Sequence, residues 1–95
     1  MKTQDEMLNL LEQKYPKMFL KPSEQFGASY KGGIWSSGEN GDLAKDGFKL
    51  FNYYAEDPKE RRYVLGVHKE IGNFLEKHGW YAEWYDCGTI MLWPI

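Results

Sequence analysis

The fold prediction rests on residues 57–79, which read DPKERRYVLGVHKEIGNFLEKHG. Apolar residues recur there at spacings of three and four, which is typical of a helix with one face turned to a core. These residues, with Tyr63 alongside, are Val64, Val67, Ile71, Phe74 and Leu75. We therefore predict a central amphipathic helix over about residues 58–78, with a small sheet packed against it.

Residues that commonly begin and end helices lie at both ends of this predicted helix. Asp57 is a good N-cap, because its carboxylate can accept a hydrogen bond from a backbone N–H of the first turn. Pro58 suits the first helical position, where a missing N–H costs nothing. At the other end, His78 suits the C-cap and Gly79 can adopt the left-handed conformation that ends a helix.

Two glycines count against a helix of this length. Gly66 and Gly72 each cost ~1 kcal/mol relative to alanine in a helix interior. A competing interpretation therefore starts the helix near Tyr63 and leaves residues 57–62 as a charged turn.

The remaining elements complete an α+β domain. Thr3 to Glu6 has the form of a capping box, which predicts an N-terminal helix over about residues 4–14. Residues 25–35 and 48–55 are predicted strands, and residues 36–47 form a polar loop between them. Residues 80–94 predict a C-terminal hairpin. The prediction is one domain over residues 1–95, in the order α-β-β-α-β-β, with an antiparallel four-stranded sheet.

Charge and cysteine content narrow the function classes. The chain has 12 basic and 14 acidic residues and a net charge of −2, so it lacks the basic arm that would bind duplex nucleic acid. The single cysteine, Cys87, favours a reducing compartment. No stretch approaches the ~20 apolar residues of a membrane span. We therefore expect a cytoplasmic protein that binds neither duplex nucleic acid nor a membrane.

Aromatic residues crowd the predicted C-terminal hairpin. Five of them lie within a short span: Trp80, Tyr81, Trp84, Tyr85 and Trp93. Side chains alternate along a strand, so aromatics occupy both faces and one face is expected to stay accessible. Exposed Tyr and Trp are enriched at protein interfaces, although cross-strand packing would also explain them. The candidate protein-binding residues are Tyr81, Tyr85, Trp84 and Trp93, joined by the loop carboxylates Glu39 and Asp42.

Catalytic and metal-binding patterns are weak by comparison. Cys87 could pair with His68 or His78, but no motif surrounds it, and we expect it to be incidental. One cysteine and two histidines lack the paired spacing of a zinc site. We therefore assign no catalytic residue, no metal and no cofactor, and we regard an enzyme as the less favoured class.

The sequence thus favours a small non-catalytic protein-binding domain that acts through an aromatic-rich surface. Its general character suggests an accessory or inhibitor protein of a phage or other mobile element, although no residue carries that suggestion. One alternative is a small enzyme or ligand-binding domain with a pocket between helix and sheet. A second is a single-strand nucleic-acid binder that uses Lys31, Lys49, Arg61 and Arg62. A homodimer stays open.

Overall fold

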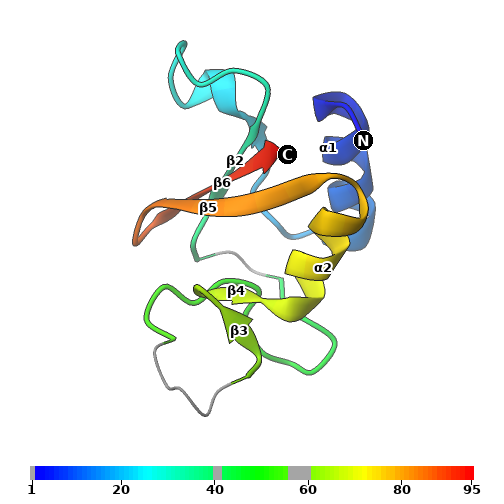
Figure 1. Ribbon diagram of the computed structural model, residues 1–95, viewed down its shortest axis with the longest axis vertical. Coiled ribbons are helices and arrows are strands. Elements are labelled where there is room, and N and C mark those ends of the chain that lie inside the picture. The colour runs from blue at the N-terminus through cyan, green and yellow to red at the C-terminus, as the bar shows by residue number, and fades with distance from the viewer. Residues whose placement is uncertain (1, 40–41, 56–60) are drawn as a thin grey trace.

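Two helices lie on one side of a four-stranded antiparallel sheet in the computed structural model, which describes residues 2–39, 42–55 and 61–95 (Figure 1). The strand order in the sheet is β1-β2-β6-β5, and a separate two-stranded ribbon pairs β3 with β4. The elements are α1 (Gln4–Lys14), β1 (Lys21–Pro22), a 3-10 turn η1 (Ser23–Gln25), β2 (Ile34–Ser37), β3 (Tyr63–Val64), β4 (Val67–His68), α2 (Lys69–Lys77), β5 (Trp80–Asp86) and β6 (Thr89–Pro94). The predicted α+β class with a four-stranded antiparallel sheet is confirmed.

Helix α1 begins where the sequence predicts. The backbone N–H of Glu6 donates to Oγ1 of Thr3 at 3.3 Å, and the N–H of Thr3 donates back to Oε1 of Glu6 at 3.0 Å. The helix ends at Tyr15, the residue before Pro16. These interactions lie within a few residues of one another, so local sequence was sufficient to predict them.

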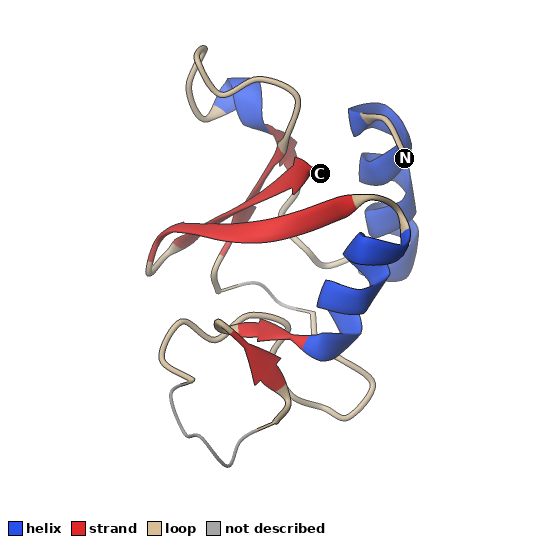
Figure 2. Cartoon of the chain, in the orientation of Figure 1, coloured by secondary structure: helices blue, strands red, loops and turns tan. Residues whose placement is uncertain are grey.

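The predicted central helix is wrong over its first part. Residues 63–68 form a tight hairpin of β3 and β4, and α2 begins only at Lys69 (Figure 2). Both turn residues have positive φ, 51° at Leu65 and 76° at Gly66, which is the geometry of a two-residue hairpin turn and not of a helix. The predicted cap Asp57 and the following residues to 60 lie outside the described residues.

The second half of the predicted helix is present, with a different cap. His68 is the N-cap of α2, and its Nδ1 accepts a hydrogen bond from the N–H of Glu70 at 3.0 Å. At the other end His78 is the C-cap, and Gly79 has a φ of 80° as expected. The helix therefore packs beside the start of β5 and is not clearly central to the fold.

The predicted strand over residues 25–35 begins only at Ile34. Ser23 holds the preceding segment in a loop, because its buried hydroxyl accepts from the N–H of Gly33 at 2.9 Å and donates to the carbonyl of Tyr30 at 2.8 Å. The N–H of Tyr30 also donates to the carbonyl of Gly27, which closes a turn. Alternation in the sequence could not reveal this hydroxyl bridge.

The predicted strand over residues 48–55 does not form either. Only two isolated bridges occur in this region, from Lys49 to Leu43 and from Phe51 to Val67. Asn52 turns the chain, because its side chain accepts from the N–H of Tyr54 at 3.2 Å and its carbonyl accepts from Ala55. The fourth strand of the sheet is instead β1, which pairs with β2.

One core lies between the helices and the inner face of the sheet. It takes side chains from both helices, from the four strands β2, β4, β5 and β6, and from the irregular segment around residue 50. The fully buried apolar residues among them are Met7, Leu11, Ile34, Leu50, Phe51, Ile71, Leu75, Trp80, Ile90 and Leu92. Phe74, predicted to be buried, is only partly so, and Val64 is 58% exposed because it lies on the hairpin.

Replacing Ile71 by Ala should lower the free energy of unfolding by ~2–5 kcal/mol, because it leaves a cavity in this core. Val64→Ala should change it by less than about 0.5 kcal/mol, since Val64 is exposed. Urea unfolding of both variants measures the difference. An equal loss for the two variants would mean that the hairpin residues 63–68 are helical after all.

Candidate functional site

Strand β5 separates its side chains between two surfaces. Trp80 and Ala82 point into the core, whereas Tyr81, Glu83 and Tyr85 point to the opposite side of the sheet. Tyr81 is 40% exposed and Tyr85 is 52% exposed. The expectation that aromatics on one face of the hairpin stay accessible is therefore met, and both helices lie on the other face.

This outer side of the sheet carries a group of aromatic residues, four of which contact one another through their rings. We call it the outer aromatic face, and it consists of Phe26, Tyr30, Trp35, Tyr81, Tyr85 and Trp93, with Met91 beneath them. Phe26 is its hub, with ring centroids 4.9 Å from Tyr85, 5.2 Å from Trp35 and 5.4 Å from Tyr30. All three contacts are edge-to-face, which is a favourable geometry for aromatic pairs.

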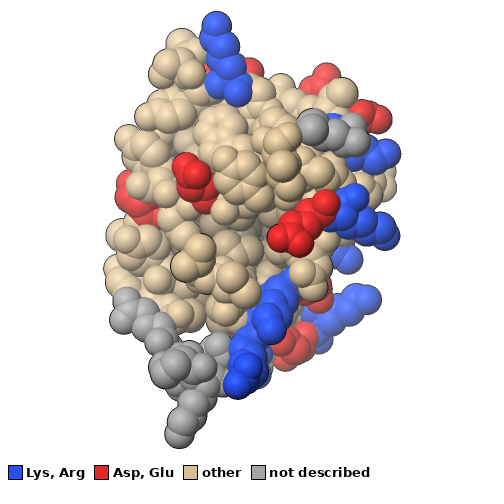
Figure 3. All heavy atoms as spheres, in the orientation of Figure 1, with Lys and Arg blue, Asp and Glu red and all other residues tan. Residues whose placement is uncertain are grey.

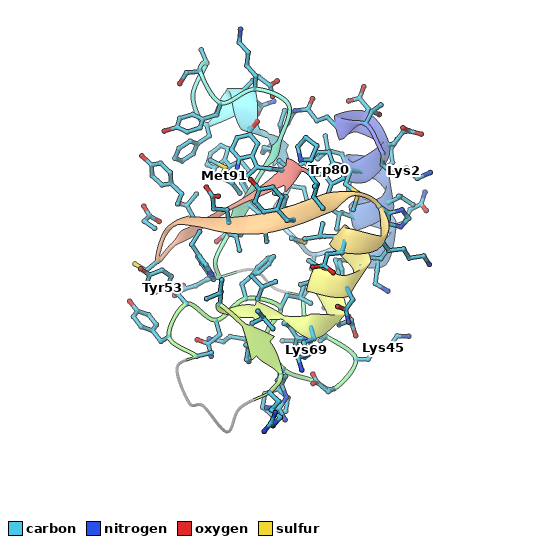
Figure 4. The ribbon with its side chains drawn as sticks, in the orientation of Figure 1. Lys2, Lys45, Tyr53, Lys69, Trp80 and Met91 are labelled. Atoms are coloured by element: carbon cyan, nitrogen blue, oxygen red, sulfur yellow. The ribbon has the colours of Figure 1, made fainter. Side chains whose placement is uncertain are left out.

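Strand register places these rings together. On β6, Met91 pairs with Trp35 on one side and Glu83 on the other, and Trp93 pairs with Tyr81. Met91 is only 3% exposed although it points away from the helices, so the aromatic residues supply its cover (Figure 4). Gly33 has to be glycine here, since an added Cβ would lie 2.4 Å from the Trp93 ring.

Charges of both signs adjoin the outer aromatic face, where Lys21 lies directly opposite Trp35 and Lys31 follows Tyr30. Glu83 is exposed between Tyr81 and Tyr85 on β5, and Asp86 follows at the end of the strand. In the view of Figure 3, a largely uncharged surface has most of its Lys and Arg side chains along one margin. A hydrogen bond with the Tyr30 hydroxyl raises the pKa of Tyr85.

The structure does not bring all predicted site residues onto this face. Trp84 points to the inner side, where its ring lies 5.1 Å from Tyr53 and 6.2 Å from Phe51. Its Nε1 donates to the carbonyl of Leu65 at 2.9 Å, so it anchors the β3–β4 hairpin to the sheet. Trp84 therefore stabilises the fold from the inner side of the sheet, and it does not belong to the same surface as Tyr81, Tyr85 and Trp93.

The two loop carboxylates also lie elsewhere. Asp42 accepts a hydrogen bond from the backbone N–H of Lys17 at 2.6 Å, which ties the loop to the chain after α1. Glu39 is exposed beside a hollow of about 230 Å³ that Lys49, Leu50 and Phe51 also line. Neither residue adjoins the aromatic rings, whereas Phe26, Tyr30 and Trp35 do. The sequence pattern missed these three because it assigned the first two to a strand that does not form.

The sequence does not favour a thiol–histidine pair, and Cys87 and His68 each contact other residues. Cys87 is exposed in the hairpin turn, and its sulfur hydrogen-bonds with the hydroxyl of Tyr54, which raises the pKa of that tyrosine. The Nδ1 atom of His68 accepts a hydrogen bond from the backbone N–H of Glu70, and its Nε2 atom lies 2.9 Å from the Asp46 carboxylate. Within residues 2–39, 42–55 and 61–95, no group of three or more His, Cys, Asp or Glu is placed to hold a metal ion.

Basic residues proposed for nucleic-acid binding are similarly dispersed. Arg62 forms an ion pair with Asp46 at 3.2 Å and stacks on the Phe48 ring at 3.6 Å. The outer aromatic face lies on the opposite side of the sheet from this segment, and Glu83 lies on this face at the edge strand β5.

Glu70 links three parts of the fold. Its carboxylate accepts from the Tyr15 hydroxyl at 2.7 Å and from the Lys45 backbone N–H at 2.8 Å. Partial burial acts to raise the pKa of Glu70, but these two hydrogen bonds outweigh it, and the net pKa is lowered. Burial, with the hydrogen bond to Glu70, raises the pKa of Tyr15 well above its usual range.

The stability contributed by ionised Glu70 should therefore be lost in acid. A carboxyl with a lowered folded-state pKa stabilises fully above its unfolded pKa near 4.5 and loses this contribution as the pH falls through the folded value. Glu70→Gln should flatten the fall of melting temperature between about pH 6 and about pH 3, whereas exposed Glu12→Gln should leave the slope unchanged. Identical slopes in parent and Glu70→Gln would contradict the assigned role.

No protein-family model matches the chain, and neither a curated protein nor a solved structure shows significant similarity to it. Among the described residues, no helix is both long enough and apolar enough to cross a membrane.

Proposed function

We propose that this chain is a non-catalytic protein-binding domain that contacts its partner through the outer aromatic face. The observation that carries the proposal is the exposure of Tyr81 and Tyr85 on the sheet face that the helices leave uncovered. Large aromatic residues are enriched at protein interfaces and carry much of their binding energy.

Preorganisation supports the same surface. Tyr85 is held by edge-to-face contacts with Phe26 at 4.9 Å and with Tyr30 at 6.1 Å. A side chain that is already fixed loses less conformational entropy when a partner binds. Rigid tyrosines with a hydroxyl at the rim can therefore contribute both apolar contact and hydrogen bonds.

Charge favours a protein partner over single-stranded nucleic acid. A nucleic-acid surface combines stacking rings with a positive groove that follows the phosphates. Here Glu83 lies between the two exposed tyrosines, and the chain carries a net charge of −2. A partner with basic or neutral residues around an apolar centre fits this arrangement better.

The setting of this function is part of the proposal. The single cysteine supports a reducing compartment, and hence the cytoplasm. An accessory or inhibitory role for a phage or mobile element stays a prediction, as does the absence of duplex nucleic acid and membranes among the partners. A second candidate, a ligand-binding domain, is favoured by a hollow of about 200 Å³ between α2, the β3–β4 hairpin and β5.

Double replacement of Tyr81 and Tyr85 by Ser should weaken partner binding by roughly 2 kcal/mol or more, because interface tyrosines are frequent hot spots. The measurement is quantitative affinity capture from the source cells, followed by titration of the recovered partner. The melting temperature should change little, since both side chains are substantially exposed.

A matched control is double replacement of Tyr53 and Tyr54 by Ser, which removes two exposed tyrosines from another surface. This variant should retain the partner. Equal loss in both variants, or retention in both, would contradict the assignment of binding to the outer aromatic face.

A further inference from the structure

Strand β5 forms an open edge of the four-stranded sheet. The N–H of Ile95 donates to the carbonyl of Gly79 at 2.8 Å, which fixes the hydrogen-bonding phase of the β5–β6 ladder. Hydrogen-bonded and non-hydrogen-bonded pairs alternate in an antiparallel ladder, so the pair of Ala82 with Leu92 is of the second kind. The N–H and C=O of Ala82 therefore point away from β6, toward the open edge.

These outward groups of Ala82 are available for pairing. No hydrogen bond joins them to any other part of the described chain. Unpaired strand edges template the addition of another strand, and proteins often protect them with bulges. A bulge does occur on β5, but only between Trp84 and Asp86, so the ladder is regular from Trp80 to Trp84.

An apolar groove of about 200 Å³ lies directly beside this edge. Its lining includes Ala82 on β5, Gly72 on α2, and Val64, Leu65 and Val67 of the hairpin. A dry protein cavity of about 150 Å³ holds one benzene molecule, so the groove has room for one apolar side chain. Polar groups stand at its rim, among them Lys69, which Figure 4 labels at the start of α2.

We infer that the β5 edge accepts an extended peptide segment of a partner protein as a fifth strand, with one apolar side chain in the groove and a basic residue next to it. This inference rests on the proposed protein-binding function and names a second contact through which the partner would bind. In strand addition, main-chain hydrogen bonds give affinity and pockets for alternate side chains give specificity.

Register determines which partner residue fills the groove. Directly opposed residues in a sheet place their side chains on the same face. The peptide residue opposite Ala82 therefore points to the inner side, where Ala82 lines the groove. Its neighbour in the peptide lies on the outer side, opposite Glu83, where a Lys or Arg would form an opposite-charge cross-strand pair.

A second copy of the chain fits the same edge less well. Antiparallel pairing of two β5 strands about Ala82 would oppose two methyl groups and leave both grooves empty. Pairing about Glu83 would place two carboxylates opposite each other, and like charges in that position are destabilising. A segment of a different protein with an apolar residue and a neighbouring basic residue would both fill the groove and pair with Glu83.

The test uses a synthetic peptide, acetyl-Thr-Thr-Lys-Leu-Lys-Thr-Thr-amide, whose palindromic sequence presents the same side chains in either strand direction. In antiparallel pairing, the arrangement tested, its central leucine exchanges both backbone hydrogen bonds with Ala82. Titrated to millimolar concentration into the ¹⁵N-labelled full chain, it should shift the amide resonances of Ala82, Gly72 and Val67. The same peptide with N-methyl-leucine at its centre should bind roughly tenfold more weakly or not at all, because it lacks the central donor. Equal binding of the methylated peptide would overturn strand addition in favour of a simple apolar-ligand groove.

Two protein variants complete the test. Gly72→Leu fills the groove, and because an added Cβ would meet only Val67 Cγ1 at 3.8 Å, the helix tolerates it. It should weaken the peptide roughly tenfold or more, whereas Gly72→Ala should weaken it by less than about threefold. Glu83→Lys should reverse the preference toward a peptide with Glu in place of both Lys residues.

Three results would overturn the inference. They are unchanged amide resonances at millimolar peptide, unchanged affinity in Gly72→Leu, and a parent protein that sediments as a dimer paired through Ala82. The peptide test needs no natural partner. If it failed, the capture experiment with the Tyr81 and Tyr85 variant would still test the proposed protein-binding function. Retained capture by the Tyr81 and Tyr85 double variant, with peptide binding intact, would in turn contradict only the outer aromatic face.

Discussion

The alternation of side chains along the paired strands β5 and β6 is the constraint on which the structure depends. Ile90 and Leu92 enter the core beneath the helices, so Met91 between them has to point the other way. A buried Met91 then requires a second apolar layer, which Phe26 and Trp35 supply from the segment before and within β2. The same alternation that builds the core therefore also creates the outer aromatic face.

Directional polar contacts hold the helices to this sheet. The indole N–H of the fully buried Trp80 donates to the carbonyl of Lys2 at 2.8 Å, which fixes the start of α1 against the start of β5 (Figure 4). Glu70 joins α2 to Tyr15 and to Lys45 in the same way. A small core is thus supplemented by hydrogen bonds between segments far apart in the sequence, and the one from the buried Trp80 satisfies an indole N–H that burial would otherwise leave unpaired.

The proposed binding surfaces share one strand. Tyr81 belongs to the outer aromatic face and also borders the groove beside the β5 edge. A partner strand added at Ala82 would extend the sheet and bring its outer side chains next to Tyr81 and Glu83. The two surfaces can consequently act as one interface, in which the edge sets register and the aromatic face adds contact area.

The candidate site could be predicted from the sequence only where alternation decides it. Alternation in the hairpin was sufficient to expect Tyr81 and Tyr85 on one face. Alternation also groups Trp84 with Trp80 on the other face, but it could not show which of the two faces the helices would cover. Nor could it show that Glu39 and Asp42 would lie apart from the rings, because loop positions depend on distant partners such as Lys17.

The sequence by itself determined α1, the end of α2 and the β5–β6 hairpin, since capping boxes, a C-terminal glycine and strand alternation act between near neighbours. Tertiary structure decided residues 63–68. Their apolar spacing fits one face of a helix, but Gly66 takes a φ of 76°, and an added Cβ there would lie 2.7 Å from the carbonyl oxygen of Asn52. That close approach, with the Trp84 hydrogen bond to Leu65, turns the segment into a hairpin. Periodicity reports which side of an element is apolar, and only contacts between distant segments choose among elements that share the pattern.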